Sequence, residues 1–252
     1  MSKVLAIINP ISGTGSKKSI PDLLARAYAP LEHELLLTYT KAAGHAEELA
    51  RRAAEEGYDH VIAVGGDGTV NEVARGLVGT KTALAIVPKG SGNGLARALG
   101  LSMSTDRVIK QLASGRRITI DSCQMNGQPF FCTCGMGFDA AVSRSFAEAS
   151  TRGPVTYLRT MIDEYRSFKP ETYRIILDEG ERTIETEAFV LVVANAPQYG
   201  NNAYIAPEAD LSDGMLDLAI IRPFPVLEAA LVLGDLMRGK LADNKYYHTE
   251  QV

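Results

Sequence analysis

Short apolar segments alternate with helical patterns along the first ~120 residues of the chain. Apolar runs typical of buried strands lie at 4–8, 34–39, 60–64 and 83–87. Helical spacing of small and apolar residues occurs between them, for instance over 44–56. Strand–helix alternation of this kind predicts a parallel sheet covered on both faces. We therefore expect an α/β domain over residues 1–120.

The pattern changes near residue 120, where short strand-like segments follow one another. These segments lie at 118–120, 130–134, 173–177, 183–187 and 189–194. Asn126-Gly127 and the segment 178–180 are typical of hairpin turns, and helical patterns cover 156–168 and 225–241. We therefore predict a second, mostly antiparallel β-rich domain over residues 121–252.

A glycine-rich segment follows the third apolar run, with the sequence Gly65-Gly66-Asp67-Gly68-Thr69. Glycines allow a ligand close to the backbone, and the free amides and dipole of a following helix favour an anion. The Asp67 carboxylate is a suitable ligand for the magnesium that accompanies a nucleotide. The segment therefore predicts a phosphate site, against the alternative of a simple tight turn.

Three common nucleotide motifs do not explain this segment. The chain contains no G-x-x-x-x-G-K-[ST], and Asn71 stands where a dinucleotide fingerprint needs its third glycine. The glycine loop, H-R-D and D-F-G set of protein kinases is also missing from the sequence.

Four candidate contact segments each follow directly after a predicted strand. They are 9–13, Thr40, 65–69 and 90–93. In parallel sheets, ligands bind beyond the carboxyl ends of the strands. We therefore expect these four segments to meet at one edge of one sheet.

Composition narrows the function further. The chain has 252 residues, 46% hydrophobic content and a net charge of −4, which excludes a bulk basic protein that binds nucleic acid. No apolar run approaches the roughly 18 residues of a spanning helix, and the first residues are typical of a strand rather than a signal peptide. Three cysteines without a visible ligand set favour a reducing cytoplasm.

Five segments in order along the chain carry a family resemblance. They are Asn9–Gly13, Thr40, Gly65–Val73, Pro88–Asn93 and Asp213–Asp217. Together they resemble the diacylglycerol kinase catalytic domain family, whose members carry N-P-x-S-G, G-G-D-G-T-x-N-E, P-x-G-[ST]-x-N and D-G-x-L-D. The resemblance implies an NAD kinase/diacylglycerol kinase-like α/β domain followed by a β-sandwich domain.

The resemblance also implies an activity, its cofactors and its site. The activity would be ATP-dependent phosphoryl transfer to a lipid hydroxyl, most simply diacylglycerol to phosphatidic acid, with ATP and Mg²⁺. Asp67 would act in catalysis through magnesium at the phosphates. The expected nucleotide-binding residues are Asn9, Pro10, Ser12, Gly13, Thr40, Gly65, Gly66, Gly68, Thr69, Asn71, Glu72, Gly90, Ser91 and Asn93. A structural magnesium would be held by Asp213, Asp210 and the carbonyl of Met215.

Two departures from the family pattern limit these expectations. Gly94 stands where bacterial diacylglycerol kinases commonly have Asp, which weakens any inference about the substrate side of that loop. The chain contains no D-G-E, the motif that carries the family's general base. We interpret the second domain as truncated at its C-terminus, and expect nucleotide binding to exceed catalysis.

Two other functions remain open at this stage. An NAD kinase shares the G-G-D-G-T loop, although its Asn-Glu pair comes later in the chain than Asn71-Glu72. A non-catalytic nucleotide-binding regulatory protein is compatible with the missing D-G-E. For the lipid kinase we expect a cytoplasmic protein with peripheral contact to the membrane that holds its substrate, no nucleic-acid partner, and a possible homodimer.

Overall fold

The computed structural model describes residues 2–13, 17–31, 33–148 and 154–252. Internal contacts divide the chain into two units, Met1–Phe131 and Cys132–Val252, whereas the change of sequence pattern lies near residue 120. The two boundaries differ because the hairpin of β5 (Cys123–Met125) and β6 (Gln128–Phe130) belongs to the first unit. Arg75 holds this hairpin, because its guanidinium donates a 2.8 Å hydrogen bond to Gln128 Oε1.

The first unit is built on a four-stranded parallel sheet. Its strands are β1 (Lys3–Ile8), β2 (Glu34–Tyr39), β3 (His60–Gly65) and β4 (Ala83–Pro88), in the order β2-β1-β3-β4. Every neighbouring pair is parallel, so the predicted α/β architecture is confirmed. All four carboxyl ends therefore lie at one edge of the sheet.

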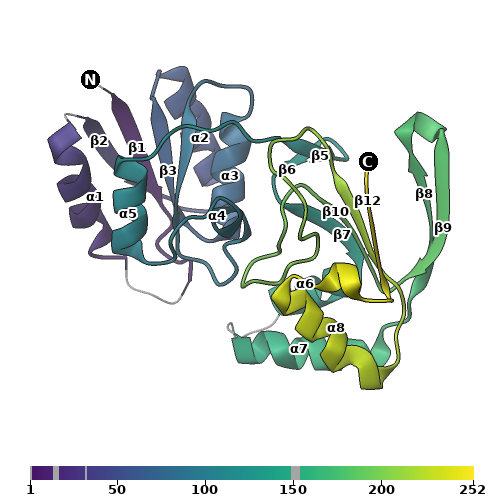
Figure 1. Cartoon of the computed structure of the whole chain (residues 1–252). Coiled ribbons are helices and arrows are strands. Elements are labelled where there is room, and N and C mark those ends of the chain that lie inside the picture. The colour runs from purple at the N-terminus through teal and green to yellow at the C-terminus, as the bar shows by residue number, and fades with distance from the viewer. Residues whose placement is uncertain (1, 14–16, 32, 149–153) are drawn as a thin grey trace. The chain divides into compact units, whose positions relative to one another are not determined.

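Helices cover both faces of this sheet (Figure 1). On one face, α1 (Ile20–Tyr28) and α5 (Thr105–Ala113) bury Leu24 and Ile109 against the strands. The other face carries α2 (His45–Glu55) and α3 (Asp67–Leu77), and short segments η1 (Ala29–Leu31) and α4 (Gly94–Ala98) complete the unit. The helices α2 and α3 pack closely because Gly76 has no side chain: a Cβ there would lie 2.5 Å from the Glu47 carbonyl oxygen.

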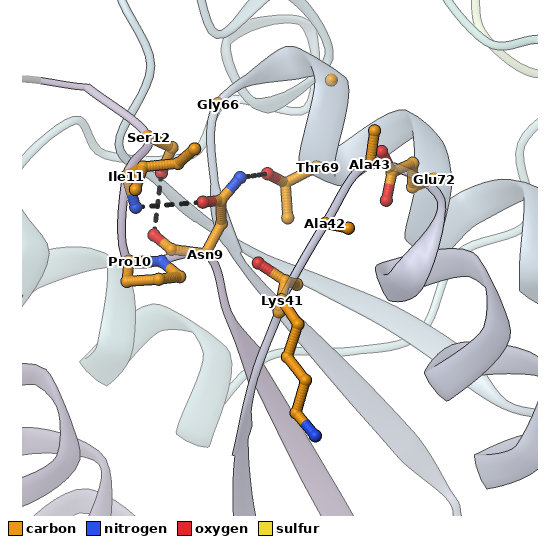
Figure 2. A pocket seen from close by; sticks show the side chains of 12 residues that line it. Asn9, Pro10, Ile11, Ser12, Lys41, Ala42, Ala43, Gly66, Thr69 and Glu72 are labelled. Atoms are coloured by element: carbon orange, nitrogen blue, oxygen red, sulfur yellow. Dashed lines mark hydrogen bonds between the residues drawn. The ribbon is translucent and has the colours of Figure 1, made fainter.

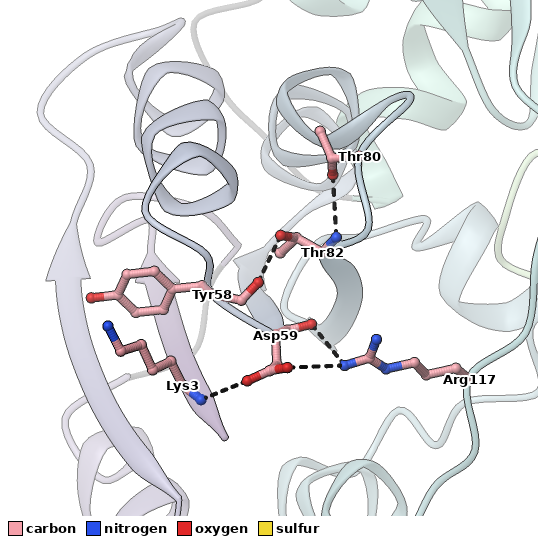
Figure 3. A network of polar contacts seen from close by, with 6 residues as sticks. All are labelled: Lys3, Tyr58, Asp59, Thr80, Thr82 and Arg117. Carbon is pink, nitrogen blue, oxygen red and sulfur yellow. Dashed lines mark hydrogen bonds and ion pairs between the residues drawn. The ribbon is translucent and has the colours of Figure 1, made fainter. Parts of the chain in front are cut away.

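Polar contacts fix the amino-terminal ends of the strands (Figure 3). The Lys3 amide donates to Asp59 Oδ2 over 2.9 Å, and this bond is the largest cause of the lowered pKa of Asp59. Arg117 donates to the Asp59 carbonyl oxygen over 3.1 Å. The expected strand at 118–120 is wrong: this segment is an irregular connection, held by Arg117 at the residue that precedes β3, and Ile118 is 59% exposed.

The second unit contains a four-stranded antiparallel sheet. Its strands are β7 (Thr133–Gly137), β10 (Val190–Ala194), β11 (Asp217–Ile221) and β12 (Tyr247–Gln251), in the order β12-β11-β10-β7. A separate hairpin joins β8 (Glu171–Leu177) to β9 (Arg182–Ala188) through η2 (Asp178–Gly180). The predicted antiparallel class is therefore confirmed.

Alternating residues of this sheet face two different layers. Leu218 and Ile220 of β11 pack with residues of the β8–β9 hairpin. Ala219 and Ile221 belong to a cluster that includes residues of α6 (Phe138–Glu148), α7 (Pro154–Ser167) and α8 (Ala229–Arg238). Because successive side chains of a strand point to opposite faces of the sheet, β11 is buried on both faces.

Two other expected segments are divided in the structure. The expected strand at 130–134 is interrupted, because β6 ends at Phe130 and β7 begins at Thr133, on either side of the unit boundary. The helical segment 225–241 becomes η3 (Val226–Glu228), α8 and η4 (Leu241–Asp243), since Gly239 ends α8 with φ 68°.

None of the helices in the described part of the chain combines the length and the apolar character that a membrane span requires.

Candidate functional site

A pocket of about 370 Å³ lies in the first unit, where the chain leaves β1, β2 and β3 (Figure 2). The residues around it come from three of the four segments that the sequence placed at this edge. They are Asn9, Pro10, Ile11, Ser12, Thr40, Lys41, Ala42, Ala43, Gly66, Gly68, Thr69 and Glu72. The expected convergence of these segments is therefore present in the folded chain.

Asn9 joins the loop after β1 to the first turn of α3. Its Nδ2 donates a 2.9 Å hydrogen bond to Thr69 Oγ1, and its Oδ1 accepts one of 3.1 Å from the Ile11 amide. Ser12 Oγ donates to the Asn9 carbonyl oxygen over 3.2 Å, which closes the loop on itself. One amide side chain thus fixes both sides of this part of the pocket (Figure 2).

The start of α3 offers uncapped amides to the pocket. Gly66 is the N-cap residue and makes no side-chain cap hydrogen bond, and Val70 is the first residue whose amide bonds back, to the Gly66 carbonyl oxygen. The amides before it need a ligand or water. A Cβ at Gly68 would meet no atom within 4 Å, so space for a ligand lies directly in front of the helix. Uncapped amides and the helix dipole together favour an anion.

The Asp67 carboxylate binds the neighbouring loop. Its Oδ2 accepts a 2.8 Å hydrogen bond from the Asn93 amide, and its Oδ1 accepts one of 2.7 Å from the Gly94 amide. These amides stand at the start of α4, so Asp67 supplies the cap that Asn93 does not provide for its own helix. A carboxylate has further lone pairs, and the expected role of Asp67 at magnesium stays a prediction.

Two glycines allow the loops after β3 and β4 to touch. A Cβ at Gly90 would lie 2.7 Å from Gly66 Cα and 2.9 Å from Asn93 Oδ1. Asn93 Oδ1 accepts from the Gly90 amide over 2.8 Å, and Asn93 Nδ2 donates to the Gly90 carbonyl oxygen over 2.9 Å. Gly90 and Asn93 thus hold the backbone beside the pocket and do not line it.

Glu72 links α3 to α2 on another side of the pocket. Its Oε2 accepts a 3.2 Å hydrogen bond from the Ala46 amide, in the first turn of α2. Gly44, the N-cap residue of α2, provides no side-chain cap, so Glu72 takes that place. This bond positions the loop that begins at Thr40.

Positive charge lies behind the loop that follows β1. The Lys17 ammonium donates to the carbonyl oxygens of Pro10 and Ser12. Burial, and then the positive charge of Lys89, lowers the pKa of Lys17. Lys89 in turn donates to Thr105 Oγ1. Two ammonium groups near one loop favour an anionic ligand there.

The site residues predicted from the sequence include most of the pocket lining and also several residues outside it. Eight expected residues line it: Asn9, Pro10, Ser12, Thr40, Gly66, Gly68, Thr69 and Glu72. Seven others do not line it: Asp67 in the first turn of α3, Gly13, Gly65 and Asn71 beside the lining residues, and Gly90, Ser91 and Asn93 in the loop after β4. Sequence reasoning missed Ile11, Lys17 and 41–43; the position of 41–43 directly after a strand was the available signal. The Lys41 side chain extends away from the pocket (Figure 2).

The second unit holds the expected metal-binding turn. Asp210 Oδ1 accepts hydrogen bonds from the amide and hydroxyl of Ser212, at 2.9 and 2.8 Å. Asp213 Oδ1 accepts from the Met215 amide over 3.0 Å, and its Oδ2 accepts from Gln251 Nε2 over 2.8 Å. Among the described residues, no group of three or more His, Cys, Asp and Glu side chains could hold a metal ion. A cation here would therefore need backbone oxygens as well.

Comparisons with known proteins identify the family. The model of the diacylglycerol kinase catalytic domain matches residues 3–125, and that of the YegS C-terminal NAD kinase beta sandwich-like domain matches residues 132–251. A diacylglycerol kinase of Mycobacterium tuberculosis (strain H37Rv) is 32% identical over 231 residues, covering 87% of this chain and 73% of the relative. The chain belongs to the diacylglycerol kinase catalytic domain family.

Further relatives agree with this assignment. The diacylglycerol kinase of Bacillus subtilis (strain 168) is 29% identical, covering 98% of this chain and 82% of the relative. A crystal structure of a diacylglycerol kinase from Bacillus anthracis str. Sterne shares the fold, with TM-score 0.73, 23% identity, and coverage of 100% of this chain and 84% of that one. The chain spans 58% and 64% of the length of two curated relatives, from Synechocystis sp. and Chromohalobacter salexigens.

The contact between the two loops gives a stability prediction for Gly90→Ala. The new methyl group would lie 2.7 Å from Gly66 Cα, a backbone atom that cannot rotate away. We expect this overpacking to reduce the free energy of unfolding by about 1–3 kcal/mol, measured by urea denaturation. Gly68→Ala is the matched control, because no atom lies within 4 Å of its added methyl group. Equal stability of the two variants would contradict the close approach.

Proposed function

We propose that this protein is an ATP-dependent lipid kinase whose first unit binds the polyphosphate of ATP in the pocket. The observation that carries the proposal is the uncapped start of α3, which faces open space at Gly68 between the loops after β1 and β2. Membership of the family supports the reaction class.

The described residues fit a magnesium nucleotide. Main-chain amides of the first α3 turn, with Thr69 and Asn9 beside them, would bind phosphate oxygens. The ammonium groups of Lys17 and Lys89 would favour the negative charge from behind. Magnesium, when bound, neutralises charge on the transferred group, and Asp67 would contact it with the lone pairs that the two amides leave open.

Phosphoryl transfer depends mainly on alignment and charge neutralisation. The loops around the pocket provide the alignment, because hydrogen bonds of Asn9, Asp67 and Glu72 fix their positions. Relatives named diacylglycerol kinase make diacylglycerol the first acceptor to consider, with phosphatidic acid as product. The general base remains unassigned, because the printed sequence contains no D-G-E.

Gly68→Ala tests the phosphate site directly. The methyl group meets no protein atom within 4 Å, so the fold should be as stable as the parent or slightly more stable. It would nevertheless occupy the space in front of the α3 amides, and we expect ADP and ATP affinity to fall by roughly tenfold or more, as for one lost charge-assisted hydrogen bond.

Isothermal titration calorimetry with magnesium and nucleotide measures this change. Gly234→Ala, a second helical glycine with its nearest neighbour at 3.6 Å, is the control and should bind normally. Unchanged affinity in Gly68→Ala would place the phosphates elsewhere.

An acceptor screen tests the reaction itself. Radiolabelled ATP is offered with diacylglycerol, sphingosine, ceramide or NAD, the lipids dispersed in detergent micelles. We expect label on a lipid, with diacylglycerol preferred. Label on NAD would identify the rival nicotinamide kinase, whereas retained ATP binding without transfer to any acceptor would support the regulatory alternative. Either of these two results overturns the lipid kinase proposal.

We also propose that the Asp210–Met215 turn binds structural magnesium. Burial, followed by the negative charges of Asp213 and Glu208, raises the pKa of the neighbouring Asp217. A divalent cation stabilises neighbouring carboxylates in their charged form, and Asp and backbone oxygens suit magnesium. The ligands would be Asp213, Asp210 and the Met215 carbonyl oxygen.

This site predicts magnesium-dependent stability. Because the pKa of Asp217 is raised by folding, the metal-free protein should lose stability as pH rises from the unfolded value of about 3.9 through the folded value. Magnesium should lower the pKa of Asp217 and raise the midpoint of thermal unfolding at neutral pH. Both effects should be absent in the Asp213→Asn variant. Asp243→Asn, an exposed residue of η4, is the control. An equal magnesium response in Asp213→Asn would exclude the site.

A further inference from the structure

Five exposed apolar side chains project from η3 and α8 of the second unit. They are Val226 (69% exposed), Leu227 (95%), Leu231 (56%), Leu233 (42%) and Met237 (43%), and we call them the α8 patch. Isolated exposed apolar residues are ordinary, but a group on one short segment marks an interaction surface.

The opposite face of α8 is already buried. Val232 is 5% exposed, and Val232 and Leu236 pack with the cluster under the antiparallel sheet. A surface helix normally carries polar residues on its outer face. Here the other exposed residues of α8 are Ala230 and Arg238, and its one acidic residue, Asp235, is half-buried and accepts a 2.7 Å hydrogen bond from Asn244 Nδ2. The segment therefore exposes more apolar surface than packing inside the unit requires.

Positive charges flank the α8 patch. Arg222, Arg238 and Lys240 are exposed, and the ion pairs of the described residues include none of them. Lys245, by contrast, pairs with Glu228 over 3.0 Å. The whole chain carries a net charge of −4, so it has no general attraction to an anionic surface. Of the acidic residues in 222–245, Glu228 is paired with Lys245, Asp235 is half-buried and only Asp243 is exposed, so the exposed charge beside the patch is mainly positive.

We infer that the α8 patch docks on an anionic lipid bilayer. This inference rests on the proposed function, because a lipid kinase must reach an acceptor held in a membrane. Apolar side chains that enter the interface, with cations at the level of the head groups, are how helices lie on membranes. Leu227 is almost fully exposed in the 3-10 turn η3, and fluid acyl chains accept such a side chain without a matching hollow.

Vesicle flotation tests the inference with the full chain. Vesicles of phosphatidylglycerol and phosphatidylcholine are compared with vesicles of phosphatidylcholine alone. The parent should float with the anionic vesicles, and less so at high salt. The double variant L227E/L231E should reduce the partition coefficient by roughly tenfold for each leucine removed from the interface. Ile176→Glu, at a 60% exposed position of β8, is the matched control and should bind as the parent does.

A charge variant and a second assay separate the alternatives. R222E/K240E should weaken binding to the anionic vesicles and leave the small binding to neutral ones unchanged. Nucleotide affinity and transfer to a micellar acceptor should stay at the parent level in L227E/L231E, since these residues lie outside the pocket. If no acceptor is phosphorylated but flotation still depends on Leu227, the docking surface stands and the proposed function fails.

Other results overturn the docking proposal. Equal flotation of the parent and L227E/L231E would exclude this patch, as would a parent that binds no vesicle. A parent dimer in sedimentation velocity that L227E/L231E dissociates, without vesicle binding, would show that a second copy covers the patch. Circular dichroism and urea denaturation verify that each variant folds, which the exposure of the changed residues leads us to expect.

Discussion

The contact between Asp67 and the start of α4 is the constraint on which the pocket depends. One carboxylate accepts hydrogen bonds from two amides of the next loop, while Gly66 and Gly90 bring the two backbones together. The loop after β1 joins the same assembly through Asn9 and Thr69. The amides at the start of α3 are consequently held before any ligand arrives, which reduces the ordering cost of binding.

Both units bury the two faces of a sheet, but they cover those faces with different elements. The parallel sheet is covered by helices on both faces, so its polar chemistry gathers where the strands end. The antiparallel sheet buries both faces of β11 between a hairpin and helices, and its second layer of helices includes one with an uncovered apolar side. The proposed anion site and the proposed membrane-docking surface thus lie on separate elements of the chain.

The sequence predicted periodic features well and pairwise contacts poorly. The bounds of β2 were predicted fully from a segment centred on three successive leucines, 35–37, and Asn126-Gly127 formed its hairpin with φ of 50° and 75°. The segment 118–120 has the alternation of a strand but no partner, which a single segment cannot reveal. Asp67 and Glu72 were identified as site residues, yet their bonds to Asn93 and Ala46 join positions 26 residues apart, beyond any local pattern.

The Gly66–Gly90 approach has a consequence for how such a chain can change. Neither position can acquire a side chain while the other backbone stays in place, because a Cβ at either one would lie within 3.1 Å of the opposite Cα atom. A single substitution at either glycine must therefore displace one loop, and with it the spacing between strand ends. Both positions are therefore expected to remain glycine, although they lie 24 positions apart in the printed sequence.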